Sequence, residues 1–283
     1  MEMSAASGLW RIAPEERNPR RSNTRGTGEL MLHVIGTSKV ARILIGIGGS
    51  ATNDGGAGMA AALGVKFMDE RGCMLTPFPE EFSWLHNLHD LPPGSLPEII
   101  VACDVDNPLT GSRGASAVFG PQKGASPGDV VFLDEMLERL VWISGGEEQA
   151  NTPGAGAAGG LGFGLMRFAG AKLVPGFDLV AEALGMEARI READLVITGE
   201  GSLDAQTLGG KGPAGVAAMA KAAGVPVVAV AGRVEDAARP LFDAALSLES
   251  FGLPLSESIT RAPELVSQLV AGHEGLLRGL LAR

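Results

Sequence analysis

The chain has 283 residues, of which 45% are hydrophobic, enough apolar material for one large α/β domain or two smaller ones. Its net charge of −10 argues against a nucleic-acid-binding protein, because such binding depends on Lys and Arg neutralising phosphates. Cys73 and Cys103 form neither a disulfide framework nor a CxxC pair, and no apolar run reaches the roughly 18 residues of a membrane span. We therefore expect a cytoplasmic protein with no nucleic-acid or membrane partner.

The first part of the chain has little apolar pattern. Residues 1–28 combine a short apolar segment, Ala5–Trp10, with a polar and turn-rich one. Such an arm would have little to pack on ahead of a first strand, so the pattern is typical of the interior of a longer protein. Residues 28–35 are predicted to form a helix that leads into a strand at residue 40.

The stretch from 40 to 64 is the feature around which the chain is organised. The short, β-branched run Val40–Ile47 predicts a buried strand, and residues 59–63 predict a helix. The glycine loop between them would present free backbone N–H groups at a helix N-terminus, where an anion can bind. The alternative is a tight turn whose glycines only reverse the chain. Added hydroxyl, amide and carboxylate groups favour a site for a phosphate or a small polyol acid, with the candidates Gly48, Gly49, Ser50, Thr52, Asn53 and Asp54.

The middle of the chain predicts a mixture of elements. Alternation predicts a strand at 65–72, five prolines make 76–97 mostly loop, and helical spacing of apolar residues marks 129–144. The remaining predictions are a short helix within 82–88, a buried strand at 98–105, a long loop at 106–127, a glycine-rich passage at 145–164 and a helix at 178–184.

The last third of the chain has a clearer pattern. A strand at 193–199, a helix at 213–224 and a strand at 225–232 form a βαβ unit, which predicts a parallel sheet. Pro213 suits a first helical turn and Gly224 a helix C-terminus. A short helix at 236–242, a strand at 244–251 and a closing helix at 263–281 complete the prediction.

Two further groups of polar residues follow predicted strands or lie in glycine loops. Asp104, Asp106 and Asn107 come at the carboxyl end of a strand, where carboxylates can hold Mg²⁺ or accept a hydroxyl proton. The alternative is a loop capped by Asx turns. Lys123 lies between glycines in FGPQKGA, which suits a phosphate oxygen, although an ordinary surface lysine fits equally well.

The loop GEGSLDAQTLGGKGP lies between a predicted strand and the start of a helix. An acid-and-lysine loop at a helix N-terminus is suited to phosphate. Its candidate residues are Gly199, Glu200, Gly201, Asp204 and Lys211.

Two familiar nucleotide motifs fail their context tests. GAGAAG at 154–159 follows Asn151-Thr152-Pro153 instead of a strand, and no acidic residue closes a second strand about 20 residues on. The Walker pattern is absent because residue 205 is alanine and residue 212 is glycine. A nicotinamide-dependent oxidoreductase is therefore disfavoured, and a kinase would not be of the P-loop class.

Five segments in the same order closely resemble the bacterial glycerate kinase family: GIGGSATNDGGAG, VACDVDNPL, VFGPQKGA, GAGAAGGLGFGL and ITGEGSLDAQTLGGKGPAGVA. The resemblance implies an α/β protein of two domains, with the active site in the cleft between them. It implies a Rossmann-like domain formed by residues 1–55 and 170–283, and a smaller α/β domain, residues 56–169, inserted between its halves. It also implies ATP-dependent phosphorylation of glycerate with Mg²⁺, with 2-phosphoglycerate the favoured product. The implied partners are glycerate and ATP, and a homodimer is left open.

The chain departs from the family pattern at its start, where the motifs Pro-Asp-Ser-Phe-Lys-Gly-Ser and Ala-Asp-Gly-Gly-Glu-Gly are absent. We expect the Rossmann-like domain to lack its N-terminal strands and to show an uncovered sheet edge. On chemistry and placement, Asp104 is the candidate base or metal ligand, Asp106 a second metal ligand, and Lys123 and Lys211 phosphate contacts. The alternative function is a catalytically inactive truncated remnant that acts as a binding or partner subunit.

Overall fold

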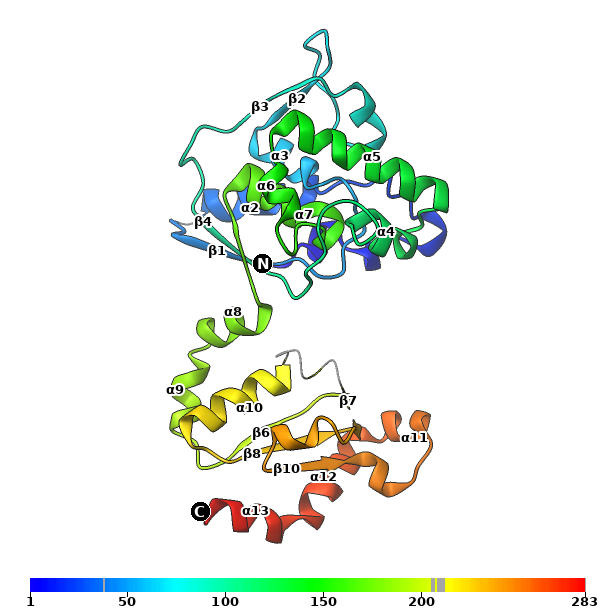
Figure 1. Ribbon diagram of the computed structural model, residues 1–283. Coiled ribbons are helices and arrows are strands. Elements are labelled where there is room, and N and C mark those ends of the chain that lie inside the picture. The colour runs from blue at the N-terminus through cyan, green and yellow to red at the C-terminus, as the bar shows by residue number, and fades with distance from the viewer. Residues whose placement is uncertain (38, 205–206, 208–211, 283) are drawn as a thin grey trace. The chain divides into compact units, whose positions relative to one another are not determined.

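The computed structural model describes residues 1–37, 39–204, 207 and 212–282, and it divides the chain into two compact units (Figure 1). Unit 1 comprises residues 1–176 and unit 2 comprises residues 177–283. Both are α/β, as predicted, and each is built on a parallel sheet. The described part of the chain contains no helix that combines the length and the apolar composition needed to cross a membrane.

Unit 1 contains a three-stranded parallel sheet and an antiparallel pair of short strands, β2 with β3. Its strands are β1 (Arg42–Gly46), β2 (Lys66–Met68), β3 (Asn87–His89), β4 (Glu98–Ala102) and β5 (Lys172–Val174). Its helices are α1 (Ser4–Ser7), η1 (Leu9–Arg11), η2 (Pro14–Glu16), α2 (Arg25–Thr37), α3 (Ala57–Leu63), η3 (Pro79–Trp84), α4 (Ala115–Phe119), η4 (Pro121–Lys123), α5 (Pro127–Ser144), α6 (Glu147–Asn151) and α7 (Ala157–Ala169).

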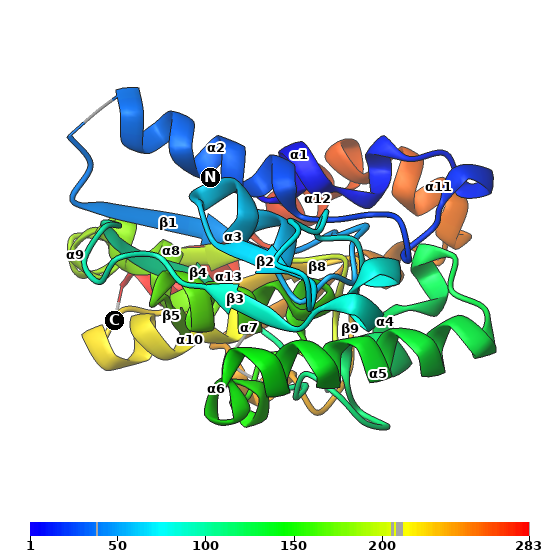
Figure 2. The ribbon, with the colours of Figure 1, turned by 90° about the horizontal axis from the view of Figure 1, so that it is seen from above.

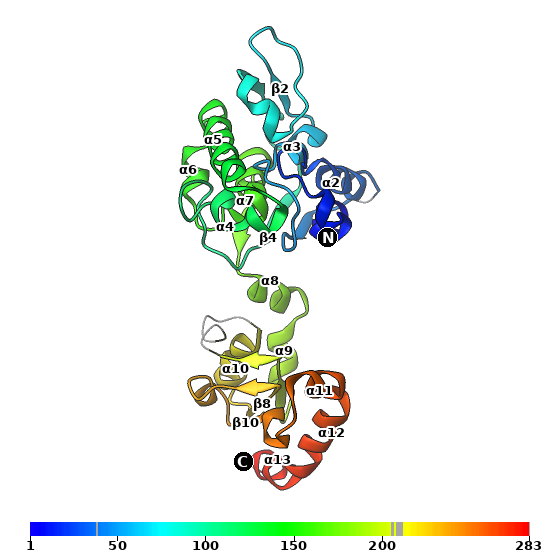
Figure 3. The ribbon, with the colours of Figure 1, turned by 90° about the vertical axis from the view of Figure 1, so that its right-hand side faces the viewer.

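The main sheet of unit 1 has the order β1-β4-β5, with Ile45 opposite Val101 in the register of the first pair. Ile43, Ile45 and Val101 are buried and pack against residues of α2, α3 and α7. These helices lie on one side of the sheet (Figure 3). Side chains of the opposite face are half-buried, since β1 and β4 share an alternating burial pattern. The continuous apolar run therefore forms the predicted strand, but only one of its faces is closed.

The N-terminal residues lie along the free edge of β1, so the expectation of an arm with little to pack on is wrong (Figure 1 and Figure 2). Glu2 bridges Gly46 in parallel, and the Met3 N–H donates to the Gly46 carbonyl at 2.9 Å. Met3 itself is fully buried in the core of the sheet. The expected uncovered edge is likewise paired at this end of β1, because the backbone of residues 1–3 forms hydrogen bonds with it, including one from the Gly46 N–H to the Met1 carbonyl at 2.9 Å.

Unit 2 is a three-layer structure. Its strands are β6 (Val196–Thr198), β7 (Ser202–Leu203), β8 (Val227–Ala231), β9 (Arg233–Val234) and β10 (Ala244–Ser247). Its helices are α8 (Gly176–Ala183), α9 (Met186–Arg191), α10 (Gly212–Ala223), η6 (Arg239–Leu241), η7 (Leu248–Phe251), α11 (Leu255–Thr260), α12 (Ala262–Gly272) and α13 (Glu274–Leu281).

The sheet of unit 2 has the order β10-β8-β6, and all its pairs are parallel. Ala217 and Ala220 of α10 pack on one face, and Leu265 and Leu269 of α12 pack on the other. The predicted βαβ unit of β6, α10 and β8 is confirmed, and Gly224 ends its helix with a positive φ of 73°. The closing helix is two helices instead of one, because the chain leaves helical geometry at His273, where φ is −111° and ψ is 20°.

Several elements are not among those that the sequence predicts, including β3, β5, α6, α7 and α9, and α4 lies within the predicted long loop. Helix α7 lies in the glycine-rich passage, where helix propensity is low. Its glycines allow close contact with a neighbouring loop, since a Cβ on Gly164 would stand 2.5 Å from the carbonyl oxygen of Gly55. Tertiary packing therefore outweighs local propensity here.

The division into units differs from the domain boundaries that the resemblance implies. Residues 1–55 contribute β1 and α2, and both elements pack with residues of 56–169 inside unit 1. The chain passes from one unit to the other once, between Gly176 and Phe177. The expected second boundary at 169/170 lies close to this point.

Candidate functional site

A cavity of about 250 Å³ opens where β1 and β4 end in unit 1. This is the edge at which open parallel sheets bind their ligands. The predicted residues Gly48, Gly49, Ser50 and Asp104 all border it. The remaining lining residues are Ile47, Ala102, Cys103, Val105, Phe119, Gln122, Ala157 and Ala158. The structure thus brings two separately predicted segments, the glycine loop and the end of β4, to one cavity.

The glycine loop is held from behind by the N-terminal segment. The Leu9 N–H donates to the Gly49 carbonyl at 2.8 Å, and the Ala51 N–H donates to the Ser7 carbonyl at 2.9 Å. Gly49 has a φ of +71°, a conformation that side chains disfavour. The backbone N–H groups of Gly48, Gly49 and Ser50 have no hydrogen-bond acceptor among the described residues. These unpaired donors belong to residues that border the cavity.

The start of α7, which contributes Ala157 and Ala158 to the lining of the cavity, has an unusual backbone. Ala158, Gly159 and Gly160 have φ values of 55°, 71° and 86°, so the chain makes a left-handed turn there. A left-handed conformation costs a residue with a side chain, such as Ala158, roughly 1–2 kcal/mol. Strained backbone of this kind persists where its surroundings impose it, often at ligand sites. The Ala158 N–H also has no acceptor among the residues the structure describes.

The glycine loop and the start of α7 both contribute residues with unpaired backbone N–H groups to the lining of this cavity. Such groups can bind a small anion, such as a carboxylate or a phosphate, because N–H dipoles stabilise negative charge. Asp104, on the same cavity, adds a carboxylate. Its Oδ1 accepts the Gly176 N–H at 2.8 Å, which fixes the side chain at the end of unit 1. An anion cradle beside a carboxylate can hold an acid while a nearby hydroxyl group is deprotonated.

The carboxylates at the end of β4 differ in their fit to a magnesium ion. Both oxygens of Asp106 accept hydrogen bonds from Nη2 of Arg113, at 3.0 and 2.9 Å. The Asn107 side chain donates to the Arg113 carbonyl. By contrast, Asp104 Oδ2 has no ion-pair partner among the described residues. Mg²⁺ commonly uses one or two carboxylates together with substrate phosphates, so Asp104 fits that role better than Asp106.

Among the residues that the structure describes, no group of three or more His, Cys, Asp or Glu side chains is placed to bind a metal ion. A magnesium ion held here would depend on substrate phosphates for much of its coordination.

Three residues of the predicted loop do not face the cavity. Thr52, Asn53 and Asp54 are at most 2% exposed. Asp54 accepts hydrogen bonds from the N–H and hydroxyl groups of Thr24, both at 2.8 Å, and from the Gly58 N–H at 2.9 Å. Its burial raises the pKa of the Asp54 carboxyl above its ordinary value. Asp54 therefore joins the start of α2 to the start of α3.

Lys123 is also enclosed. Its side chain is 1% exposed, and its Nζ donates to the Thr52 carbonyl at 2.7 Å. Burial lowers the pKa of the Lys123 amine to about 7, and the nearby Asp54 partly opposes that shift. Its neighbour Gln122 borders the cavity, but the lysine amine lies beneath the loop.

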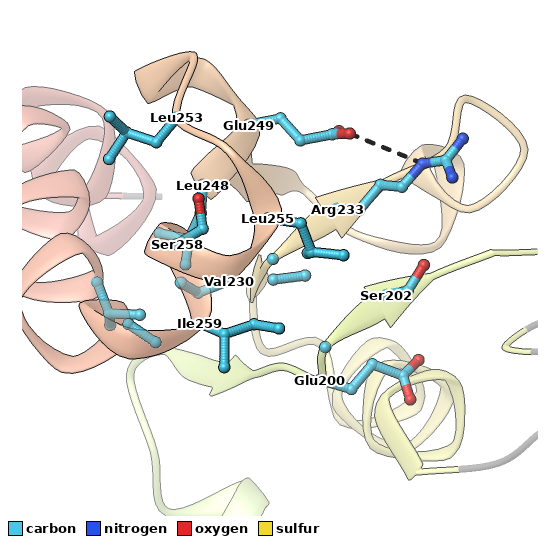
Figure 4. Close-up of a pocket in the computed structure, with 15 residues that line it drawn as sticks. Glu200, Ser202, Val230, Arg233, Leu248, Glu249, Leu253, Leu255, Ser258 and Ile259 are labelled. Carbon is cyan, nitrogen blue, oxygen red and sulfur yellow. Dashed lines mark ion pairs between the residues drawn. The ribbon is translucent and has the colours of Figure 1, made fainter.

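The remaining predicted residues belong to unit 2, where a larger cavity of about 720 Å³ lies at the carboxyl ends of β6, β8 and β10 (Figure 4). Glu200 and Gly201 border it, together with the apolar side chains of Val230, Leu255 and Ile259. Arg233 and Glu249 form an ion pair of 3.7 Å at its rim.

The polar loop that precedes α10 is partly closed on itself. Glu200 Oε1 accepts the Thr207 hydroxyl at 2.7 Å, and the Thr207 N–H donates to the Asp204 carbonyl at 3.0 Å. Gly199 is required by packing, because a Cβ there would lie 2.0 Å from the Val230 carbonyl oxygen. Lys211 lies outside the described residues.

The other eight lining residues are not among the predicted site residues, and they include Phe119, Gln122 and Ala158. Phe119 and Gln122 precede Lys123 in VFGPQKGA, and Ala158 belongs to the GAGAAG segment. That segment follows α6 instead of a strand, in agreement with its failed test as a dinucleotide motif. The glycines were visible in the sequence, but their contact with the loop at 52–56 depends on the fold.

A model of the glycerate kinase family matches residues 1–274. The chain is 44% identical over 281 residues to a glycerate kinase of Halalkalibacterium halodurans, covering 95% of this chain and 73% of that protein. It is 45% identical over 253 residues to the glycerate 2-kinase of Escherichia coli, covering 83% of this chain and 63% of that protein.

The fold agrees with a solved structure of similar sequence. The crystal structure of a protein provisionally named glycerate kinase 2, from Salmonella typhimurium LT2, superposes with a TM-score of 0.82 at 40% identity. The match covers 98% of this chain and 75% of that one. The chain therefore spans about three quarters of this solved relative's length and somewhat less than two thirds of the E. coli enzyme's.

Proposed function

This chain belongs to the glycerate kinase family, and from that premise we propose that it catalyses ATP-dependent phosphorylation of glycerate, with 2-phosphoglycerate as the favoured product. The observation that carries the proposal is the cavity at the end of β1 and β4, where backbone donors of the glycine loop lie on the same cavity as the Asp104 carboxylate. Its volume of about 250 Å³ suits a small hydroxy acid.

In this proposal the glycerate carboxylate accepts hydrogen bonds from the backbone N–H groups of Gly48, Gly49 and Ser50. Asp104 then accepts the proton of the hydroxyl group that attacks the phosphorus, or holds the metal that neutralises the phosphate. Phosphoryl transfer depends mainly on positioning and charge stabilisation, so a site made of fixed backbone dipoles and one carboxylate is chemically sufficient on the substrate side.

The proposed binding of ATP and Mg²⁺ is supported by residue chemistry and by membership of the family. Mg²⁺, when bound, would neutralise charge on the transferred phosphoryl group, and Asp104 is the residue best suited to hold it, with Asp106 second. The loop at 199–211 remains our candidate for the phosphates of ATP, because it combines Glu200, Asp204 and Lys211 ahead of a helix.

The decisive experiment is a turnover assay of the purified chain with ATP, Mg²⁺ and glycerate, followed by phosphorus NMR of the product. Asp104→Asn is the test variant, because asparagine keeps an oxygen for the Gly176 N–H but loses the charge. We expect kcat to fall by about 100-fold or more. Asp236→Asn, a change at a fully exposed carboxylate of unit 2, is the matched control and should leave turnover unchanged.

Full turnover by Asp104→Asn would refute the assignment of Asp104. No turnover by the unchanged chain, combined with saturable binding of glycerate, would instead favour a binding subunit over an enzyme. A phosphorus resonance of 3-phosphoglycerate would move the product assignment to the other hydroxyl group.

A further inference from the structure

Lys123 is a buried cation that the proposed chemistry does not use. It ends η4, is 1% exposed and donates from Nζ to the Thr52 carbonyl at 2.7 Å. Thr52 lies two residues beyond Ser50, the last cavity donor of the glycine loop. The lysine thus holds the loop by a backbone carbonyl that lies two residues after the part of the loop that borders the cavity.

The contact is costly to form, so it calls for an explanation. Removing an ammonium group from water is unfavourable unless charged or polar partners replace the water. Here the partner is one backbone carbonyl, with the Asp54 carboxyl close enough to favour the charged amine. An apolar side chain would fill the same space without that desolvation cost.

We propose that Lys123 is a positioning residue, whose amine holds the Thr52 carbonyl and thereby fixes the backbone donors of Gly48, Gly49 and Ser50 for the substrate carboxylate. This substrate role rests on the proposed function, whereas the restraint on the loop does not. It differs from the predicted phosphate contact, because an enclosed amine acts through the loop and does not touch a phosphate.

The charge on Lys123 should make its hold on the loop depend on pH. With its pKa near 7, the amine loses its proton in the neutral range, and a neutral amine makes a weaker hydrogen bond than an ammonium does. Asp54 is the charged group that acts on it. The other charged groups around η4 and α5 are engaged elsewhere: Arg17 donates to the Gln122 carbonyl, Asp129 pairs with Arg20, and Asp134 accepts the Gly111 N–H.

Lys123→Met is the test variant, because methionine keeps the length of the apolar stem and removes the amine. Lys221→Met is the matched control, since Lys221 also donates to a carbonyl, that of Pro240, but is exposed in unit 2. Thermal unfolding first establishes that both variants fold. Hydrogen exchange of a peptide spanning residues 46–55, and the kinetics of turnover, are then compared with the unchanged chain.

We expect Lys123→Met to speed exchange in that peptide and to raise the KM for glycerate by about tenfold or more, with a smaller change in the KM for ATP. Lys221→Met should change neither. In the unchanged chain the KM for glycerate should rise as the pH passes through about 7, and Lys123→Met should lack that rise.

Unchanged exchange in the loop of a folded Lys123→Met protein would overturn the inference. So would a KM effect confined to ATP, which would identify a phosphate contact. If the unchanged chain shows no turnover, the proposed function fails, but exchange in the loop still decides whether Lys123 restrains it. If Lys123→Met does not fold, the pH dependence of loop protection in the unchanged chain decides: protection should fall as the pH rises from 6 to 8.5, and constant protection would overturn the inference.

Discussion

At the scale of single residues, burial changes the role that the sequence predicts for some polar side chains. The sequence indicates that Asp54 and Lys123 contact substrate, yet the side chains of both are buried and neither borders the cavity. Thr52 Oγ1 and Asn53 Oδ1, in the same layer, are buried and have no hydrogen-bond partner among the described residues. Each unpaired polar group of this kind costs about 1–3 kcal/mol. The loop is therefore held at an energetic cost, which is common where backbone geometry serves a ligand.

The lowered pKa of Lys123 predicts how stability depends on pH. The unfolded chain carries a lysine with an ordinary pKa of 10.5, whereas the folded value is about 7. Between these values the unfolded state binds more protons, so the free energy of unfolding rises with pH. The cost of burying the charge is fully present below pH 7 and is relieved above it.

We expect the free energy of unfolding of the unchanged chain, minus that of Lys123→Met, to rise by about 1 kcal/mol per pH unit between pH 7 and 10. Urea unfolding at several pH values would measure it, with Lys221→Met as the control for an exposed lysine. A difference that is flat across this range, or that falls, would contradict an amine buried as the structure describes.

At the scale of elements, the start of α7 is shaped by its contact with the glycine loop. The Gly55 N–H donates to the Gly159 carbonyl at 3.1 Å, and a Cβ on Gly159 would lie 1.9 Å from the Thr52 carbonyl oxygen. Gly170, which ends the same helix with a φ of +64°, has no atom within 4 Å of such a Cβ. The two glycines thus share a left-handed backbone but differ in available space.

This difference makes Gly159→Ala and Gly170→Ala a matched pair. Gly170→Ala should cost about 1 kcal/mol, the penalty of a side chain in a left-handed conformation. Gly159→Ala should cost about 2–4 kcal/mol, because it adds a clash with backbone that forces the loop away. Denaturant unfolding measures both changes in the free energy of unfolding, and equal losses would show that α7 and the loop are not in close contact.

At the scale of the whole molecule, each unit has a hydrophobic core of its own. Leu137 of α5 is fully buried among residues of unit 1, and Leu269 of α12 is 4% exposed among residues of unit 2. Units with separate cores can unfold as separate cooperative transitions.

We therefore expect calorimetry to resolve two transitions, each sensitive to its own core. Leu137→Ala should lower the transition of unit 1, and Leu269→Ala that of unit 2, since such changes cost about 2–5 kcal/mol. A single transition that both variants shift equally would show that the two cores unfold as one cooperative system.

Much of the architecture was predictable because it depends on local pattern. The strand at β1, the glycine loop after it, the βαβ unit of β6, α10 and β8, and the position of Asp104 at the end of β4 all follow from apolar runs and glycine punctuation. The motifs that resemble the family are also short stretches of contiguous sequence, so family membership could be predicted from the sequence as well.

The direction in which each polar side chain of the site points was not predictable, because it depends on contacts between residues far apart in the chain. Ser50 and Asp54 are four residues apart, yet one borders the cavity and the other is bound by Thr24. Lys123 reaches Thr52 across 71 positions, and Ala158 borders the cavity only because its turn packs on the loop. Burial and long-range hydrogen bonding decide these roles, and neither leaves a signature in local residue spacing.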